Sequence, residues 1–562
     1  MGGVCTREVF SSAMDADIPA VPQSWDAHVW KNAPAPVRCV PSASLLQTCL
    51  RALCEHPETL ERTLTRLPRE LAQELLTELL AQRRRLTDRE LRAFHDCSLA
   101  FLDLSFLPVG DVLLTEVCAS HQASLLRLSL GGTAVLDLSA LRDCTQLKSL
   151  SLRGCAAVDF AALASLSRLE VLNLHGCVFV NDSTVAHLAS CVALRVLDLT
   201  LCKGVRNLEP LGALPLRTLS LGWTSVDDSA MAHVAAMPWL TSLQLERTRI
   251  SDAGIETLSR MACLTSLSLA GCAVGTCGSS LARLRSLTSL SLAQTRFNDA
   301  GLGSLAAGPS LRRLDLSSTQ VTDVGLRENA GALSSLLELS VESTSCRGSS
   351  LAAYRLLQSL NLADTETSDA CMEQVGSLPL HTLSLAFCSI TSAALRRWPL
   401  PVSLRSLSLQ DARGVATMAE LSHLCQLESL VLPDSTLDGS LTLVTCLRGS
   451  LHTLEVSSSS ITDASFAHVA QLPLLRHLSL ARSRLTDASI PLLCAALRQL
   501  QTLNLSGTDV TGAGLRMLAA EASAELLSVS LFRTTNVSAE DVQRAAELRP
   551  ALRILHCVPP RV

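Results

Sequence analysis

The side chains best suited to chemistry in this chain are 21 cysteines and 13 histidines. Pairs of the form CxxC, which hold zinc or exchange disulfides, do not occur in the sequence. The histidines, such as His187, His233 and His468, are scattered, and the motifs GxxxxGK(S/T), GxSxG and HExxH are absent from it. The sequence therefore predicts no catalytic residue, no metal site and no cofactor, and we expect a protein that is not an enzyme.

Five of the cysteines instead recur at one position of a repeated phrase. The phrase LxxLxLxx(C/T/S)x(V/I) returns about every 24 residues from near Leu125, for example as LKSLSLRGCAAV from Leu147 and LRRLDLSSTQV from Leu311. A small, partly polar side chain at this slot suits a buried contact with the backbone of the turn. We therefore expect cysteines that pack singly in a reducing compartment. The slot holds Cys155, Cys177, Cys202, Cys272 and Cys388 in some copies and Thr133, Thr248, Thr295, Thr319, Thr365 and Thr508 in others.

Each copy of the phrase has the pattern of a strand followed by a helix. Because alternate side chains of a strand point to opposite faces, the leucines of LxLxx point inward and the residues between them point outward. Many copies continue with text such as Ser251-Asp252-Ala253-Gly254. Ser, Thr or Asp before an apolar helical run indicates a helix N-cap. We expect each repeat to close with a short helix behind the sheet.

These features resemble the leucine-rich repeat family, in its cysteine-containing type, over residues 99–562. The resemblance implies an α/β fold: a curved horseshoe of about 20 repeats, with a parallel sheet on the concave face and short helices on the convex face. It also implies a binding surface rather than a particular activity, because function is not fixed by fold. An α-helical cap is expected at the N-terminal end of the solenoid.

Composition limits the classes of function and location. Length alone, at 562 residues, predicts several domains, but a solenoid accounts for it as one. A formal net charge of −5 argues against a nucleic-acid partner, which requires a basic stripe. The sequence has no run of 18 apolar residues and no secretory leader, so we expect a cytoplasmic protein.

The first forty residues carry a lipidation pattern. Met1-Gly2-Gly3-Val4-Cys5-Thr6 matches the N-myristoylation motif at Gly2, and Cys5 is a candidate for palmitoylation. Two acyl chains give stable membrane binding where one does not. The sequence leaves two alternatives open: a flexible segment, residues 1–40, that contacts the inner face of a membrane, or a chance match to a short motif.

Residues 41–98 have a helical pattern whose first part places Leu45, Cys49 and Leu53 on one stripe. This stripe resembles the elongin BC-box, and the resemblance implies that these three residues bind elongin. Such docking places one apolar helix face in a groove of the partner.

The following stretch, LPRELAQEL from Leu67, is similar to the cullin box that follows a BC-box in substrate receptors. The resemblance implies a cullin partner. The same letters are also similar to the start of an F-box, which joins a cullin through another linker. The residues that match the cullin box are Leu67, Pro68, Leu71 and Leu75.

A structural alternative exists for the same helical segment. The last repeat at each end of a solenoid would expose its hydrophobic core, and atypical terminal segments cover it. Helices expected at residues 42–54, 57–66 and 68–82 would then form only a cap.

The concave face predicted for the repeats is dominated by serine and other small polar residues, so it offers few anchors. Binding hot spots are enriched in Trp, Tyr and Arg. The best cluster groups Trp223 with Gln244, Glu246 and Arg247 on adjacent copies. The predicted protein-binding residues are Trp223, Gln244, Glu246, Arg247, Arg482, Phe532 and Arg533.

Two functional hypotheses follow. In the first, the chain is a protein-binding repeat module, in its sharper form the substrate receptor of a cullin-type ubiquitin ligase. In the second, it is a structural scaffold associated with a membrane or the cytoskeleton. The partner, the oligomeric state and the acylation state are not specified by the sequence.

Overall fold

The computed structural model describes residues 69–81, 88–107, 109–157, 159–308, 310–397, 403–410, 424, 426–432, 447–456, 461–549 and 552–556. The chain divides into two units, Met1–Pro57 and Glu58–Val562, and every described residue belongs to the second.

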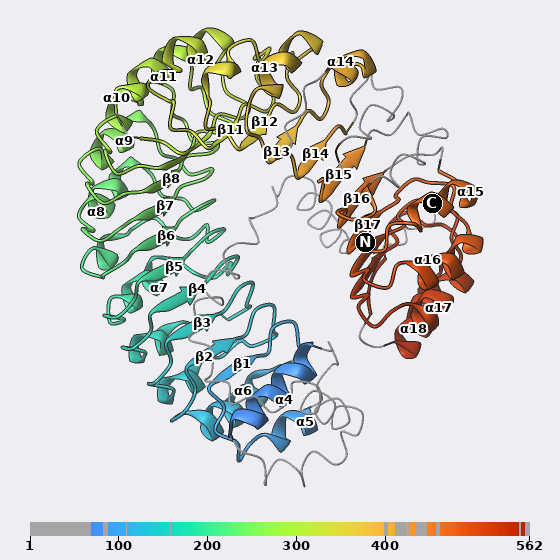
Figure 1. The fold of residues 1–562 in the computed structure, drawn as a ribbon. Helices are drawn as coiled ribbons and strands as arrows, with labels where there is room; N and C mark the ends of the chain where they lie inside the picture. Colours follow the sequence, from blue (N-terminus) through green and yellow to red (C-terminus); the bar gives the residue numbers. More distant parts are fainter. Residues whose placement is uncertain are drawn as a thin grey trace, which may run out of the picture. The chain divides into compact units, whose positions relative to one another are not determined.

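The described residues form one parallel sheet of 20 short strands, in which each strand pairs with the next along the chain. From β1 to β13 the strands follow the inner side of the ribbon's curve and the helices its outer side (Figure 1). This arrangement confirms the predicted solenoid. The strands are β1 (Phe101–Asp103), β2 (Arg127–Ser129), β3 (Ser149–Ser151), β4 (Val171–Asn173), β5 (Val196–Asp198), β6 (Thr218–Ser220), β7 (Ser242–Gln244), β8 (Ser266–Ser268), β9 (Ser289–Ser291), β10 (Arg313–Asp315), β11 (Glu338–Ser340), β12 (Ser359–Asn361), β13 (Thr382–Ser384), β14 (Ser406–Ser408), β15 (Ser429–Leu432), β16 (Thr453–Val456), β17 (His477–Ser479), β18 (Thr502–Asn504), β19 (Ser528–Ser530) and β20 (Arg553–Leu555).

The core is a stack of leucines. We number repeat positions from the first leucine of LxxLxLxx. Leucines at positions 1, 4 and 6 point inward, as Leu216, Leu219 and Leu221 do, each 0% exposed. Position-4 leucines lie opposite one another across the sheet, as Leu219 does with Leu243. Each buried leucine stabilises the fold by about 1.5–3 kcal/mol, so the repeated phrase alone fixes the strand register.

The helices behind the sheet begin where the sequence predicts caps. The hydroxyl of Ser251 accepts from the backbone N–H of Ala253 at 3.3 Å, and that of Thr322 accepts from Val324 at 3.2 Å. The α-helices are α4 (Arg69–Ala81), α5 (Asp88–Ala93), α6 (Asp111–His121), α7 (Asp182–Leu188), α8 (Met231–Ala235), α9 (Asp252–Leu258), α10 (Gly278–Leu281), α11 (Asp299–Ala306), α12 (Asp323–Asn329), α13 (Met372–Gly376), α14 (Ser392–Arg397), α15 (Asp463–Val469), α16 (Ile490–Ala496), α17 (Gly512–Glu521) and α18 (Ala539–Leu548).

Several repeats close with a 3₁₀-helix instead of, or before, an α-helix. The two at Ser139–Asp143 and Ala161–Ser165 carry no Ser/Thr-Asp pair at the start. Their first backbone N–H groups instead donate to Asp137 and Asp159, each at 2.8 Å. The 3₁₀-helices are η2 (Ser139–Asp143), η3 (Ala161–Ser165), η4 (Glu209–Leu211), η5 (Asp228–Ala230), η6 (Leu351–Ala353), η7 (Asp369–Cys371) and η10 (Asp487–Ser489).

The slot at position 9 bonds the turn backbone, as predicted, but Thr and Cys do so differently. Thr248 donates to the carbonyl of Leu245 in its own repeat at 2.7 Å. The thiol of Cys272, at the same position of the next repeat, reaches back to the same carbonyl at 2.9 Å. Threonine therefore closes its own turn, whereas cysteine ties its turn to the preceding repeat.

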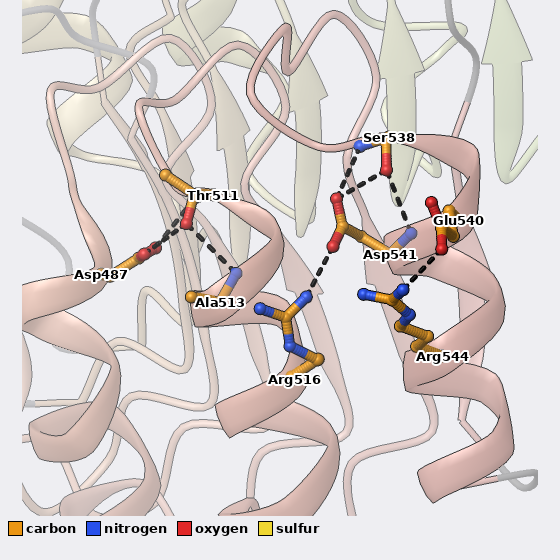
Figure 2. Close-up of polar contacts among 8 residues, drawn as sticks. All are labelled: Asp487, Thr511, Ala513, Arg516, Ser538, Glu540, Asp541 and Arg544. Atoms are coloured by element: carbon orange, nitrogen blue, oxygen red, sulfur yellow. Dashed lines mark hydrogen bonds and ion pairs between the residues drawn. The ribbon is translucent and has the colours of Figure 1, made fainter.

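A second set of bonds joins consecutive repeats through the first residue of each helix. The carboxylate of Asp487 accepts from the backbone N–H of Thr511 at 2.8 Å and from its hydroxyl at 2.5 Å, while Thr511 caps its own helix through Ala513 at 3.1 Å (Figure 2). The aspartates of this ladder thus act between repeats, and the residue before each of them, such as Thr486 before Asp487 or Asn298 before Asp299, is the N-cap. Equivalent bonds link Asp228 to Ser251, Asp299 to Thr322, Asp369 to Thr391 and Asp463 to Thr486.

The ladder changes at the last helix pair. Gly512, the first residue of α17, replaces the aspartate that would bond the start of α18. A Cβ on Gly512 would lie 2.1 Å from the carboxyl carbon of Asp541. Asp541 occupies this space, caps α18 with Ser538 and pairs with Arg516 at 2.5 Å (Figure 2). The final link therefore runs from the later repeat back to the earlier one.

The first strand is covered by α4. The side-chain amide of Gln73 donates to the carbonyl of Phe101 at 2.7 Å and accepts from the backbone N–H groups of Ala100 and Phe101 at 3.1 and 3.0 Å. An edge strand otherwise presents unpaired backbone groups. Gln73 therefore takes the place of a preceding strand.

Candidate functional site

One repeat position has the same unusual backbone throughout the described repeats. Position 8 of the repeat, three residues after the end of the strand, has a φ between +50° and +71° in every described repeat. Glycine adopts this conformation without strain, whereas other residues incur about 1 kcal/mol or more. The residues are Gly132, Gly154, Gly176, Gly271, Gly507, Phe106, Leu201, Trp223, Arg247, Gln294, Ser318, Ser343, Asp364, Phe387, Arg482 and Arg533.

Trp223 and Arg247 occupy this position in consecutive repeats and contact each other. The guanidinium carbon of Arg247 lies 4.8 Å from the centre of the Trp223 ring, which is cation–π geometry. Beyond the ring the Arg247 side chain crosses Gly271, where a Cβ would lie 2.7 Å from its Cγ. Its terminal nitrogen then donates to the side-chain oxygen of Gln294, two repeats further on. The guanidinium of Arg247 is therefore held between the Trp223 ring and the side chain of Gln294.

Glu246 and Gln244 lie beside this pair on the concave face. Oε2 of Glu246 lies over Gly222, 2.9 Å from where a Cβ would stand. Burial raises the pKa of the Glu246 carboxyl, a hydrogen bond from Ser268 opposes that change, and the charge of Asp198 adds to it. Gln244 accepts from the hydroxyl of Ser220 at 2.7 Å. The structure thus brings together the four residues that the sequence grouped, and we call them the Trp223 cluster.

Sequence reasoning missed two neighbours on the same face. Nδ1 of His175 lies 3.8 Å from Oδ2 of Asp198, and Oδ1 of Asp198 accepts from the backbone N–H of Thr200 at 2.9 Å. Asp198 is only 7% exposed. A charged residue at position 5, where most repeats carry serine, was the available signal.

The other three predicted protein-binding residues lie apart from the Trp223 cluster. Arg482 follows β17, and Phe532 and Arg533 follow β19. Phe532 is 43% exposed. The chain therefore carries two separate groups of candidate residues.

The concave face of β16–β19 has a shallow depression of about 200 Å³. Its sides are polar: Nδ1 of His477 lies 2.8 Å from the hydroxyl of Thr502, and Asn504 donates to Ser479 at 3.1 Å. Glu455 also lines it. Its polar residues bond one another, so it offers few free groups to a ligand.

The candidate partner-binding and lipidation residues of the N-terminus lie mostly outside the described residues. Of the predicted cullin-box residues, Leu71 is half-buried and Leu75 is 0% exposed. Burial of Leu75 is what a cap residue requires, and docking through it would need α4 to move. The predicted residues outside the described part are Gly2, Cys5, Leu45, Cys49, Leu53, Leu67 and Pro68.

Most cysteines of the described part are buried, which suits packing better than nucleophilic chemistry, whereas Cys263 is exposed. A hydrogen bond with Cys118 lowers the pKa of the buried Cys144. Burial raises the pKa of the Cys177 thiol to about 12, and the thiol donates to the carbonyl of Leu152 at 2.9 Å. A thiol, not a thiolate, is therefore present at neutral pH. In the same part of the chain, no three His, Cys, Asp or Glu side chains are placed to hold a metal ion. No helix there is long and apolar enough to cross a membrane.

Comparison with known proteins agrees with this architecture. The family model described as "Leucine Rich repeat" matches residues 236–259, 309–328 and 497–519. No curated protein matches the sequence.

Among solved structures, the chain is similar to an internalin of Listeria monocytogenes (24% identity over 57% of this chain and 88% of the other; TM-score 0.43). It is also similar to the plant peptide hormone receptor RGFR1 in complex with RGF2 (16% identity; 84% and 93%; TM-score 0.37) and to TLR13 in a complex with ssRNA13 (17%; 82% and 85%; TM-score 0.45). These TM-scores are low, so the fold rests on the strand ladder of this chain itself.

Proposed function

We propose that this leucine-rich repeat solenoid is a non-enzymatic protein-binding module and that the Trp223 cluster is the centre of its binding surface. The observation that carries the proposal is the stack of Arg247 on Trp223. Trp and Arg are the residues most enriched at the centres of protein interfaces.

The backbone at these two residues supports a role in binding. Both have positive φ, at +59° and +52°, where the next repeat has the unstrained Gly271. The other described residues at position 8 share this backbone, so it belongs to the repeat, and at Trp223 and Arg247 it fixes the direction in which both side chains leave the chain. A half-buried ring and a cation that is fixed before binding also lose little entropy when a partner docks.

A matched pair of tryptophan substitutions tests this proposal. Trp223→Ala is expected to abolish recovery of partner proteins in a cross-linked pulldown from cells of the source organism. Trp239→Ala is the control, because Trp239 is 62% exposed but lies outside the cluster, before the first leucine of its repeat. Equal recovery by both variants and the wild type would contradict the proposal, provided that circular dichroism shows all three folded.

The sharper hypothesis is a substrate receptor of a cullin-type ubiquitin ligase. Its support is the order of the two boxes in the sequence, with Leu45, Cys49 and Leu53 before Leu67, Pro68, Leu71 and Leu75. The full burial of Leu75 supports the competing role of α4 as a cap. A Leu45→Asp/Cys49→Asp variant that still folds should lose elongin and cullin peptides from the pulldown. Unchanged recovery, or none from the wild type, would leave these helices as a cap.

The scaffold alternative depends on acylation of Gly2 and Cys5 at the inner face of a membrane, and cytoplasmic location remains a prediction. Fractionation of a Gly2→Ala variant tests the membrane contact. Loss of the protein from the membrane fraction would support it, and an unchanged distribution would exclude it. The two functions are compatible, because a tethered protein can also bind a partner through its repeats.

A further inference from the structure

His121 is buried where the N-terminal cap meets the first repeat. It is the last residue of α6 and is 3% exposed. Residues 94–99, which lie between α5 and β1 in the chain, contact the same end of α6, since the hydroxyl of Ser124 donates to the carbonyl of Leu99 at 2.9 Å. We call this contact of residues 94–99 with the end of α6 the cap junction. A change of charge at His121 therefore acts directly on the attachment of the cap.

The cap residues that lead to the cap junction are apolar and buried. Leu91, Phe94 and Leu99 are all nearly inaccessible to solvent. Their burial attaches the cap, whereas the imidazole of His121 adds a polar ring to the same interior. An apolar side chain of similar size would fill this place without polar atoms that need partners. Packing alone therefore does not call for a histidine here.

The buried ring has no acceptor for a second proton. Nδ1 of His121 is buried and has no hydrogen-bond partner among the described residues, while the ring makes a hydrogen bond with the backbone of Cys97. A neutral imidazole carries one N–H group, and protonation adds another. In the closed cap junction the cation would place a charge and an unpaired N–H in the interior. Protonation of His121 is therefore favoured only when the junction opens.

The groups that face the ring do not offset its burial. Burial lowers the pKa of His121 to about 4, the charge of His95 adds to that change, and the backbone hydrogen bond with Cys97 opposes it. The carbonyl groups at the end of α6 also favour a cation. On the cap side, Nδ1 of His95 lies 3.3 Å from the carboxylate of Asp96, and both side chains are exposed. His95 can therefore take up a proton while the junction is closed, whereas His121 cannot.

Two other titratable groups near the end of α6 keep their state between pH 7.5 and pH 5. Glu116 of α6 pairs with Arg92 of α5 at 2.7 Å, and this hydrogen bond holds the pKa of the Glu116 carboxyl below its usual range. Cys118, one turn before His121, remains a thiol, because its hydrogen bond with Cys144 and its burial raise its pKa. The ion pair and the thiol are therefore unchanged in the range where His121 becomes protonated.

We propose that the cap junction is acid-sensitive: protonation of His121 releases residues 88–99 from α6 and uncovers the apolar interior behind them. The open junction takes up the proton near the ordinary value of about 6.5, whereas the closed junction does so only near 4. The cap is therefore held most firmly above pH 6.5, and its attachment weakens as pH falls from 6.5 toward 4. This device is separate from the Trp223 cluster, which lies in the repeats of β6 and β7.

Hydrogen exchange of the full chain at pH 7.5 and pH 5.0 tests the proposal. Exchange is expressed as protection factors, so that the change of the intrinsic exchange rate with pH is removed. In the wild type we expect the open fraction of residues 91–99 to rise about 30-fold between the two pH values. Residues of β10 should keep their protection, because the proposed opening is local.

Replacements that cannot take up a proton test the role of His121. His121→Leu and His121→Gln are each expected to hold the rise in the open fraction below about threefold. The matched control is His187→Gln, because His187 also lies in the last turn of a helix, α7, but in another repeat. This control should keep the full rise. His95→Ala removes the neighbouring charge that disfavours the His121 cation, so its rise should be smaller than that of the wild type.

A rise of the same size in the wild type and in the two His121 variants would overturn the proposal. An equal loss of protection at β10 would also overturn it, since the acid effect would then be general unfolding. If neither His121 variant folds at pH 7.5, His95→Ala decides the question, and a rise equal to that of the wild type would count against the proposal.

Discussion

Asp299 holds Thr322 of the next repeat through both oxygens of its carboxylate. Oδ1 accepts from the Thr322 backbone N–H at 2.8 Å, and Oδ2 accepts from its hydroxyl at 2.6 Å. The oxygen of the same hydroxyl accepts from Val324 and caps α12. One threonine therefore joins the start of its own helix to the repeat before it, so helix capping and repeat stacking depend on the same side chain.

This link requires a small residue three positions after the cap. A Cβ on Gly325 would lie 2.2 Å from Oδ1 of Asp299, whereas one on Gly303 of the preceding helix would meet nothing closer than 3.8 Å. We expect Gly325→Ala to lower the free energy of unfolding by about 2 kcal/mol, the size of a lost charge-assisted hydrogen bond. Gly303→Ala, the matched control, should raise it by about 0.5–1 kcal/mol. Urea denaturation of both variants measures the change in the free energy of unfolding. Two changes of the same sign would contradict a close contact between Gly325 and Asp299.

The ladder also shows which part of the fold is local enough to be predicted. Strand register, inward leucines and helix caps follow from residues close in sequence. The aspartate beside each cap reads locally as part of the same cap signal, yet Asp299 acts on a residue 23 positions later. The role of Asp299 depends on how two repeats are stacked. In the sequence, the glycine at position 325 was the indication that a side chain of the neighbouring repeat packs against this helix.

The Trp223 cluster was predictable in membership but not in geometry. Parallel register places equal repeat positions side by side, so Trp223 and Arg247 had to be neighbours. The direction of their side chains depends on positive φ at position 8, which the glycines at Gly132, Gly154 and Gly271 signalled without being recognised. The contact of Gln73 with the first strand could not be found from periodicity. It bonds the unpaired backbone groups of the first strand, and the repeat pattern holds no second copy of that edge.

Because φ is positive at position 8, glycine and other residues contribute differently to the free energy of unfolding there. Ser318, at φ +53°, is exposed, so Ser318→Gly should raise the free energy of unfolding by about 0.5–1 kcal/mol through relief of strain. Gly271→Ala should lower it, because the new Cβ is both strained and 2.7 Å from Cγ of Arg247. Thermal unfolding compares the two, and stabilisation by Gly271→Ala would show that Arg247 is free to move away.

Removal of the Gln73 side chain should open the first strand without unfolding the solenoid. Gln73→Ala loses three hydrogen bonds to Ala100 and Phe101, each worth about 0.5–1.5 kcal/mol. We expect faster hydrogen exchange of the Ala100 and Phe101 amides and unchanged exchange at β10. Thr77→Ala is the control on α4, because the Thr77 hydroxyl donates within the helix, to the carbonyl of Gln73. Equal protection in both variants would mean that α4 does not seal the edge.

Glu246 gives the Trp223 cluster a defined dependence on pH. Burial raises the pKa of its carboxyl in the folded chain, while the unfolded chain has the ordinary value of about 4.3. Below the unfolded value Glu246 is neutral in both states. As pH rises through the raised folded pKa, the folded state has to ionise a partly buried carboxyl, and the stability that the neutral carboxyl contributed is lost. Glu246→Gln stays neutral, so we expect it to be more stable than the wild type at pH 7.5 and equal to it near pH 4. Thermal unfolding at the two pH values measures the difference. A variant that is less stable than the wild type at pH 7.5 would mean that the charged carboxylate is stabilised in the fold, and a cationic contact, Arg247 first, would then have to outweigh burial.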